Sequence, residues 1–545
     1  MDDPAFTRMR PGAPNRRPRL ARAALALAGA LILGAPAAGQ VQVQPLAAPD
    51  LFSLGGGKSD LPSDLWQGSS GTLAKLVIPE VASHPLTPAA AALARHVLEV
   101  GGNGPEGAGN DPDLAGARAE ALLQLGDLPA VRPIVDGASN LPQLSALSRV
   151  AAETALISGQ DDKACAVGEA LVMGREGAFW LRLRAYCQAR AGQSAPAQLT
   201  LELSEQQEHR PDFDRLMTAL LSGAGGSAAP ALDDPLDFAI SRRLGLDWTA
   251  AMDAAPASIA VGVARDDAAP PAARLAAAAR AVRLGLATPE AYGALTPVPT
   301  ALPPPETPGA QAEAALVAIA GATNDLTLKE SAVIALLQRA KTGLELQGLA
   351  RLVAPAMAQI MAAHPVLRQP MLFAVAAAAA GDAASAKAAR AQVGQGGSPA
   401  TPADLALLDG LIGVASTPAE PLAADALGAA TARAGGPARA RLAAGLALVG
   451  GYAPLGPQAR FDVADADLGA EHLPSGRLLA LQQAAEQGRI GDTALYVLGT
   501  CVEAGAAGPT AAERALMIRA LRQAHLDADA RAFAVEGLVI LQARP

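Results

Sequence analysis

The chain has 545 residues, a formal net charge of −9 and only 3% aromatic residues. Beyond the first 39 residues the chain is acidic and has no basic run, so this part will not hold the phosphate backbone of a nucleic acid and will not dock on an anionic membrane surface. Apolar residues make up 51% of the chain, a share raised by alanine, the residue with the highest intrinsic helix propensity. Few stretches are rich in β-branched or aromatic residues, so the composition predicts an all-α fold.

The first 39 residues are expected to be a signal peptide. Six arginines lie between Arg8 and Arg22, and the apolar segment that follows, residues 23–33, is too short to span the ~30 Å core of a bilayer. Small residues at positions 37–39 (AAG) predict cleavage before Gln40. The mature chain is then periplasmic, with no stable membrane insertion. The alternative is an uncleaved membrane anchor.

The export route has two candidates. Arg16 and Arg17 resemble a twin-arginine signal, but Arg19 stands where that motif requires a bulky apolar residue. We therefore favour the general secretory route. Because residues 1–39 carry a net charge of +4, their removal takes the charge of the chain from −9 to −13.

After a flexible leader at residues 40–63, helical patterns run almost without pause to the end of the chain. Two stretches rich in proline or glycine interrupt them; the first has six prolines in thirteen residues and predicts an extended linker. The expected helical blocks are residues 64–295, 310–392 and 403–545, joined by linkers at residues 296–309 and 393–402.

Three glycines in the first block recur every 33 residues. Gly126, Gly159 and Gly192 each end one helical pattern and precede another. An alanine stands seven residues before each glycine, and a valine or alanine stands five residues after it. A fixed period of this length is typical of stacked helix pairs, in which one pair cannot bury its apolar face alone.

This spacing resembles the tetratricopeptide repeat, a helix pair of about 34 residues with a Gly at its turn and small residues at its close contacts. Ala185, Gly192 and Ala197 match that pattern, and the partial resemblance covers about residues 110–225. It implies an all-α helical-repeat solenoid of antiparallel helix pairs, and protein–protein interaction rather than catalysis. An irregular α-solenoid is the alternative. Further single copies are expected at residues 373–393 and 482–497.

Cys165 and Cys187 are expected to form a disulfide, because export places them in an oxidising compartment. They lie in predicted helices at about 161–173 and 177–191, and residue 176, midway between them, falls in the turn. In an antiparallel helix pair, residues equidistant from the turn lie at the same height, so the two sulfurs can meet if both side chains face the seam. The third cysteine then remains unpaired. Two reduced core cysteines are the alternative.

We predict no catalytic residue, cofactor or metal ion. Residues 55–59 (GGGKS) resemble the end of a phosphate-binding loop, but Phe52 stands where that loop needs a Gly. Residues 102–107 fit G-x-G-x-x-G but precede turn residues instead of a helix. The six histidines form no H-E-x-x-H motif, and the acidic cluster at residues 462–471 lacks the spacing of a calcium loop.

These features predict an exported, non-enzymatic helical scaffold that binds another protein of the cell envelope. The concave surface for that partner is expected within residues 110–225, where stacked helices offer an extended groove. One alternative is a peptidoglycan-acting enzyme with a helical superstructure, whose catalytic module would lie in the third block. The other is a structural protein without a single partner.

Overall fold

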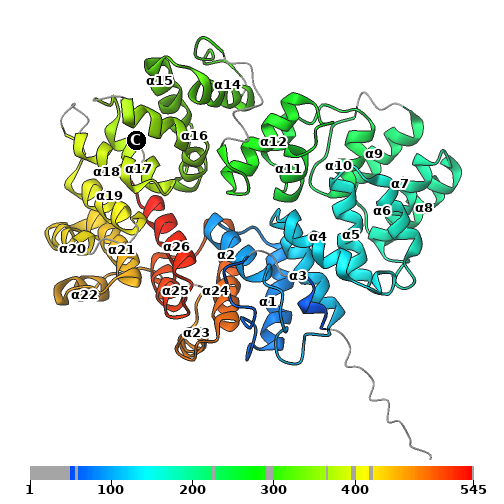
Figure 1. Ribbon diagram of the computed structural model, residues 1–545, viewed down its shortest axis with the longest axis horizontal. Helices are drawn as coiled ribbons and strands as arrows, with labels where there is room; N and C mark the ends of the chain where they lie inside the picture. Colours follow the sequence, from blue (N-terminus) through cyan, green and yellow to red (C-terminus); the bar gives the residue numbers. More distant parts are fainter. Residues whose placement is uncertain are drawn as a thin grey trace, which may run out of the picture. The chain divides into compact units, whose positions relative to one another are not determined.

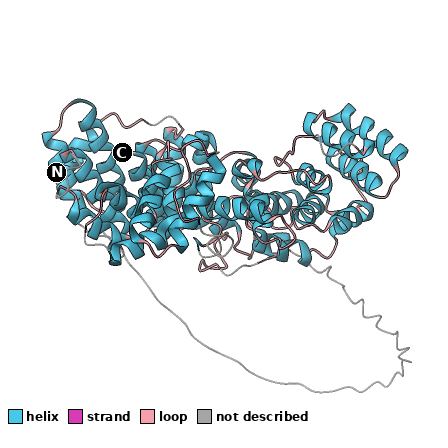
Figure 2. Cartoon of the chain, turned by 90° about the horizontal axis from the view of Figure 1, so that it is seen from above, coloured by secondary structure: helices cyan, strands magenta, loops and turns pink. Residues whose placement is uncertain are grey.

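The computed structural model describes residues 50–55, 59–223, 228–289, 299–307, 309–363, 366–394, 400–416, 422–469 and 472–542. The expected signal peptide at residues 1–39 lies outside them. The described residues form 25 α-helices and no strand, apart from a single bridge between Ser70 and Glu106 (Figures 1 and 2). The all-α prediction is therefore confirmed. Residues 48–545 make up one compact unit.

The helices before the proline-rich stretch are α1 (Gly71–Ser83), α2 (Pro88–Leu98), α3 (Pro112–Gln124), α4 (Leu128–Gly137), α5 (Ser145–Ile157), α6 (Asp161–Ala170), α7 (Ala178–Arg190), α8 (Ser194–Gln207), α9 (Pro211–Ser222), α10 (Pro235–Arg243), α11 (Ala257–Ala264) and α12 (Pro271–Arg283).

The helices after it are α14 (Gly309–Ala322), α15 (Leu326–Leu337), α16 (Gly343–Ala363), α17 (Pro370–Ala379), α18 (Ala383–Gln392), α19 (Pro402–Ala415), α20 (Leu422–Arg433), α21 (Gly436–Tyr452), α22 (Pro457–Ala464), α23 (Ser475–Glu486), α24 (Ile490–Ala504), α25 (Ala511–Gln523) and α26 (Asp527–Ile540). Short 3-10 turns are η1 (Leu51–Ser53), η2 (Leu141–Gln143), η4 (Ala250–Asp253) and η5 (Gly505–Ala507).

Neighbouring helices pack as pairs, as a helical repeat requires. Gly126, Gly159 and Gly192 lie in the turns of the consecutive pairs α3/α4, α5/α6 and α7/α8. Each has a φ between +73° and +80°. Glycine adopts this left-handed conformation without strain, whereas a residue with a side chain does not. The alanine seven residues before each glycine is fully buried. Small residues at those positions let the helices approach closely, while α1, α3 and α5 stack on one another across the pairs.

Residues 50–54 correct the prediction of a flexible leader at residues 40–63. Phe52 is fully buried and meets the ring of Trp66 edge to face, with 5.3 Å between ring centroids. The buried side chain of Arg118 donates hydrogen bonds to the carbonyl oxygens of Phe52 and Leu54, at 2.9 and 2.8 Å. It also donates to the carbonyl of Leu98 at 2.7 Å, so one guanidinium caps the C-terminal end of α2 and fixes the leader beside it.

The sequence of packed helices closes on itself. Contacts lead from α1 through α3, α5, α11, α12 and α16 to α26, and α26 packs against α2. The last helices also return to α1, because α24 packs along it (Figure 1). One continuous cluster of buried apolar side chains extends from Phe52 to Val539. Helices of all three expected blocks therefore share a core.

Three carboxylates from the last helices hold the first two helices, and we call Asp492, Asp529 and Glu536 the terminal clasp. Asp492 accepts a hydrogen bond from the backbone N–H of Ser70, directly before α1, at 2.8 Å. Glu536 accepts one from the N–H of Ala89, in the first turn of α2, at 2.7 Å. Both carboxylates satisfy N–H groups that have no partner within their own helix, at the end where the helix dipole favours an anion.

Glu536 is the buried centre of the terminal clasp. Its second oxygen accepts a hydrogen bond from Nη1 of Arg514 at 2.7 Å, and both side chains are almost wholly shielded from solvent. Nε of Arg514 donates to the carbonyl of Pro509. Gly508 leaves room for this guanidinium, because a Cβ there would lie 2.3 Å from its Nη2.

The substitution Glu536→Gln should lower the free energy of unfolding by about 3–5 kcal/mol, since it leaves the buried guanidinium of Arg514 without a counter-charge. Urea denaturation followed by circular dichroism measures the change. Asp212→Asn is the control: it removes an exposed ion pair with Arg215 and should change the free energy by less than about 1 kcal/mol. Equal effects of the two substitutions would contradict the assignment.

The third clasp contact makes stability depend on pH. His96 on α2 contacts Asp529 through Nδ1 and Asp60 through Nε2, both at 2.8 Å. The hydrogen bond to Asp529 is the main cause that raises the pKa of His96 to about 9, with burial acting against it. Only a doubly protonated imidazole donates to two carboxylates, so the ring is charged at neutral pH.

A folded-state pKa above the unfolded value of about 6.5 means that the stabilisation by His96 is complete below pH 6.5 and is lost as the pH rises to 9. The difference in unfolding free energy between the wild type and His96→Gln should therefore shrink over this range. We expect a change of about 1–2 kcal/mol, after allowance for solvent screening of the exposed Asp60 contact. A difference that stays constant between pH 6.5 and 9 would rule out this role.

Candidate functional site

Two hollows of the described surface are candidate sites. One is a polar pocket beside a disulfide in α6 and α7, and the other is an apolar groove between α1 and α24. Each has a volume of about 540 Å³. They differ in how the chain builds them, because the first comes from neighbouring helices and the second from the two ends of the chain.

The disulfide joins Cys165 of α6 to Cys187 of α7, with 5.8 Å between their Cα atoms. The predicted pairing is confirmed. The helices are shorter than expected at the turn, since α6 ends at Ala170 and α7 begins at Ala178. Closing a loop of this size stabilises a fold by about 3 kcal/mol in the chain-entropy model. The third cysteine, Cys501, is free and buried.

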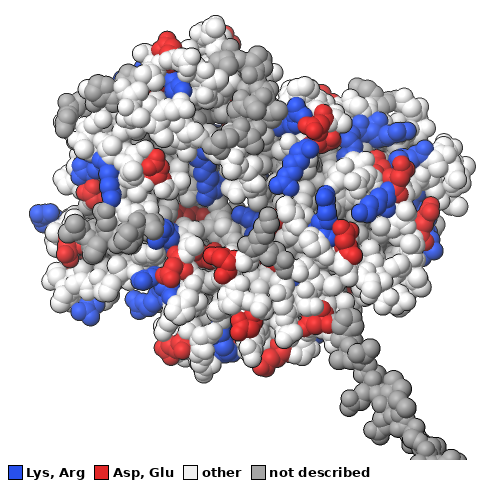
Figure 3. Space-filling view, viewed as in Figure 1, with Lys and Arg blue, Asp and Glu red and all other residues white. Residues whose placement is uncertain are grey.

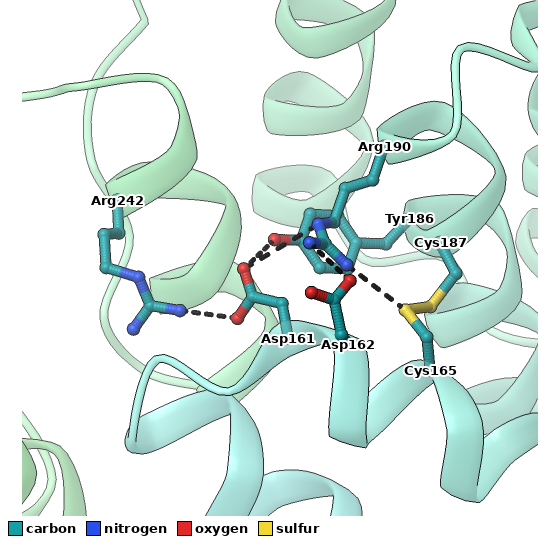
Figure 4. Close-up of a disulfide and its surroundings, with 7 residues drawn as sticks. All are labelled: Asp161, Asp162, Cys165, Tyr186, Cys187, Arg190 and Arg242. Carbon is teal, nitrogen blue, oxygen red and sulfur yellow. Dashed lines mark hydrogen bonds and ion pairs between the residues drawn. A yellow bond between two sulfur atoms is a disulfide. The ribbon is translucent and has the colours of Figure 1, made fainter.

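Arg190, one turn after Cys187, lies directly beside the disulfide (Figure 4). Its Nη1 is 3.7 Å from Sγ of Cys165, and its Nη2 donates to a carboxylate oxygen of Asp162 at 2.9 Å. The carboxylate of Asp161 lies 3.9 Å from Nε. Arg190 therefore bridges the N-terminal turn of α6 and the sulfur of Cys165.

Asp161 is fixed by further partners from other helices. It accepts a hydrogen bond from the hydroxyl of Tyr186 at 2.8 Å and another from Arg242 of α10 at 2.6 Å (Figure 4). Burial, together with the neighbouring carboxylate, raises the pKa of Tyr186, so its hydroxyl keeps its proton and remains a donor. The charge network thus spans three helices and holds the guanidinium of Arg190 near the disulfide.

The pocket opens onto both cysteines. Its lining includes the half-buried Cys165 and Cys187, the ring of Trp180 and charged groups of both signs: Asp162, Glu169, Arg175, Arg184 and Arg190. A small residue, Gly168, faces Leu183 and Trp180 in its wall. The disulfide is therefore at the wall of an open, polar hollow, not in the apolar core.

The groove between α1 and α24 is lined by one stripe from each helix. Leu73, Leu76 and Val77 come from α1, and the second stripe consists of Leu495, Tyr496, Gly499 and Val502. Leu76 is 65% exposed, so the groove offers a large apolar side chain to solvent. The helices run in the same direction, because Gly491 adjoins Ser69 and Gly499 adjoins Val77. Glycine at position 499 leaves the floor of the groove open.

Charged residues close one end of the groove. Arg477 of α23 forms a bidentate pair with Glu503, at 2.7 and 2.5 Å. Opposite it, His84 lies 3.2 Å from a carboxylate oxygen of Glu80. Both glutamates are about half exposed, but Glu503 is already paired with Arg477. Glu80, whose partner His84 is a cation only when it is protonated, is therefore the acidic group at this end that a ligand can meet.

The residues that build this groove could not be identified from the sequence. A repeat copy is expected at residues 482–497, but no local pattern shows that this segment meets α1. Arg118, His96 and the terminal clasp were likewise not predicted. Arg118 has one signal in the sequence, because it is a charged residue within an otherwise apolar helical face.

Charges on the face shown in Figure 3 alternate in sign, with Lys and Arg interspersed among Asp and Glu. Within the described ranges, no cluster of three or more His, Cys, Asp and Glu side chains could hold a metal ion. The cluster at residues 462–471 instead has a buried member, Asp462, which pairs with Arg439; Glu471 lies outside the described residues. None of the described helices has the length and apolar character needed to cross a membrane.

Comparison with known proteins gives no relative: the chain matches no protein-family model, no curated protein and no solved structure.

Proposed function

We propose that the chain is an exported, periplasmic scaffold of tetratricopeptide-like helix pairs, which is not an enzyme and binds another protein of the cell envelope. The observation that carries the proposal is the apolar groove between α1 and α24, with its exposed Leu76. Exposed apolar hollows rimmed by polar residues are typical of interaction sites.

The dimensions of the groove favour a helical ligand. Its lining on α1 extends from Leu73 to His84, which is about 16 Å at 1.5 Å per residue. Helices that bind in grooves use apolar anchors at i, i+3 or i+4 and i+7, a span of about 10 Å. The occupant is therefore an amphipathic helix of a partner protein, about three turns long.

Charge defines the rest of the occupant. Glu80 lies at the exposed end of the groove, Glu503 beside it is paired with Arg477, and the chain as a whole is acidic. A basic residue next to the apolar anchors would meet the carboxylate of Glu80, whereas an acidic segment would be repelled. The partner segment thus combines an apolar face with a Lys or Arg at one end.

Export is tested by the mature N-terminus. Sequencing the protein from the cell envelope should find the first residue at or within a few positions of Gln40, because a signal peptidase cleaves after small residues. An intact N-terminus on protein from the cytosolic fraction would contradict export.

The groove is tested with a photo-reactive amino acid at Leu76, and at Leu199 as the matched control. Leu199 is similarly exposed, at 60%, but lies on α8, away from the groove. Cross-linking in the native organism should occur from position 76 and should identify a segment with an apolar helical face and a basic end.

The cross-linked segment is then synthesised and its affinity measured. Leu76→Asp should weaken binding by about tenfold or more, as expected for a central apolar anchor. Glu80→Gln should weaken it by about threefold, and Leu199→Asp should leave it unchanged. Equal affinities for the Leu76→Asp and Leu199→Asp proteins, or a segment without an apolar face, would refute the proposal.

A further inference from the structure

We propose that the Cys165–Cys187 disulfide is a site of thiol–disulfide exchange with a partner protein that carries a dithiol. In this reaction Cys187 is the sulfur attacked and Cys165 is the leaving thiolate. The proposal is independent of the α1/α24 groove. It rests on the access to the disulfide, on the position of Arg190 and on the packing of the surrounding helices.

Access comes from the pocket. Both cysteines are half-buried and both line a hollow of about 540 Å³. A disulfide that serves only to hold a core together has no need of such an opening. The turn between α6 and α7, which contributes Arg175 to the lining of the pocket, also exposes Val172 and Met173, at 65% and 66%. Exposed apolar side chains on this turn would help a partner protein to dock.

Arg190 makes the two sulfurs chemically unequal. Its Nη1 lies 3.7 Å from Sγ of Cys165, and the structure gives no such cationic contact to Cys187. A thiolate is stabilised by a neighbouring guanidinium, and a thiol of lower pKa leaves faster in exchange. Attack on Cys187 therefore releases the better leaving group. Asp162 and Asp161 share the charge of Arg190, but Nη1 remains directed at the sulfur.

Contacts other than the disulfide also hold α6 and α7 together. The helices α5 to α10 share their own apolar cluster, which includes Trp180, Tyr186 and Leu201. The ion pair between Arg190 and Asp162 and the hydrogen bond between Tyr186 and Asp161 also join α6 to α7. With these contacts in place, the hairpin keeps its geometry after reduction, and the two thiols stay close enough to be oxidised again.

The exchange takes place in two steps. A thiolate of the partner attacks Sγ of Cys187; the S–S bond breaks, a mixed disulfide forms, and Cys165 leaves as a thiolate beside Arg190. The second thiol of the partner loses its proton and attacks the partner's first sulfur, which is bonded to Cys187 in the mixed disulfide. This attack releases Cys187. Two electrons pass to this chain, whose cysteines take up the two protons, and the partner becomes a disulfide.

The test uses the oxidised full chain and small thiols as probes. The rate of reduction by dithiothreitol is measured by alkylation and peptide mapping, and reduced glutathione shows which cysteine carries the mixed disulfide after acid quenching. Cys501 is an internal control, since its buried thiol is alkylated only if the protein unfolds. Arg190→Gln removes the cation, Arg190→Lys retains it, and Arg184→Gln removes another arginine of the same pocket.

We expect the disulfide to be reduced while Cys501 stays unlabelled, and we expect glutathione to bind chiefly to Cys187. Arg190→Gln should slow reduction by about three- to tenfold, Arg190→Lys should restore most of the rate, and Arg184→Gln should have no effect. Labelling of Cys501 during reduction, glutathione chiefly on Cys165, or equal rates for Arg190→Gln and Arg184→Gln would each overturn the proposal. The last result is what a purely structural disulfide gives.

Discussion

The buried ion pair between Glu536 and Arg514 is the interaction on which the arrangement of the helices depends. A stack of helix pairs ordinarily leaves an uncovered apolar face at each end, and such proteins need polar capping repeats. Here each end covers the other, because α2 packs against α26 and α1 against α24. Two buried charges are costly unless they are paired and hydrogen-bonded, and the backbone N–H of Ala89 completes the coordination of Glu536. The polar network thus specifies one pairing of the chain ends, to which apolar packing then adds stability.

Local features of the fold could be predicted from the sequence because their causes are local. A glycine with positive φ, small residues seven positions before it, and two cysteines equidistant from a turn all act within one helix pair. Gly126, Gly159, Gly192 and the bond between Cys165 and Cys187 belong to this class. The terminal clasp does not, since 447 residues separate Ala89 from Glu536. The chain holds 52 acidic residues, and nothing in the sequence near Glu536 distinguishes it from the others.

The error in the leader has a different physical cause. Residues 40–63 were expected to be flexible from their composition, which is rich in Gly, Pro and Gln and lacks a helical period. One aromatic side chain was enough to change that outcome locally, since Phe52 enters the core and Arg118 binds the carbonyls around it. Backbone carbonyls occur at every position and leave no trace in a sequence pattern. The position of Arg118 in an apolar helical face can be seen in the sequence, but the backbone carbonyls that accept its hydrogen bonds can be found only from the structure.

The two candidate sites are held in place by different contacts of the fold. The groove exists only where the first and last helices meet, so it requires the terminal clasp. The pocket beside the disulfide belongs to helices α5 to α10, whose own apolar cluster contains no residue beyond Leu246. Opening the clasp would remove the groove and leave the α6/α7 hairpin and its disulfide in place. Conversely, reduction of Cys165 and Cys187 is expected to leave the contacts of α1 with α24 unchanged, so the proposed binding in the groove and the proposed exchange at the disulfide can operate independently.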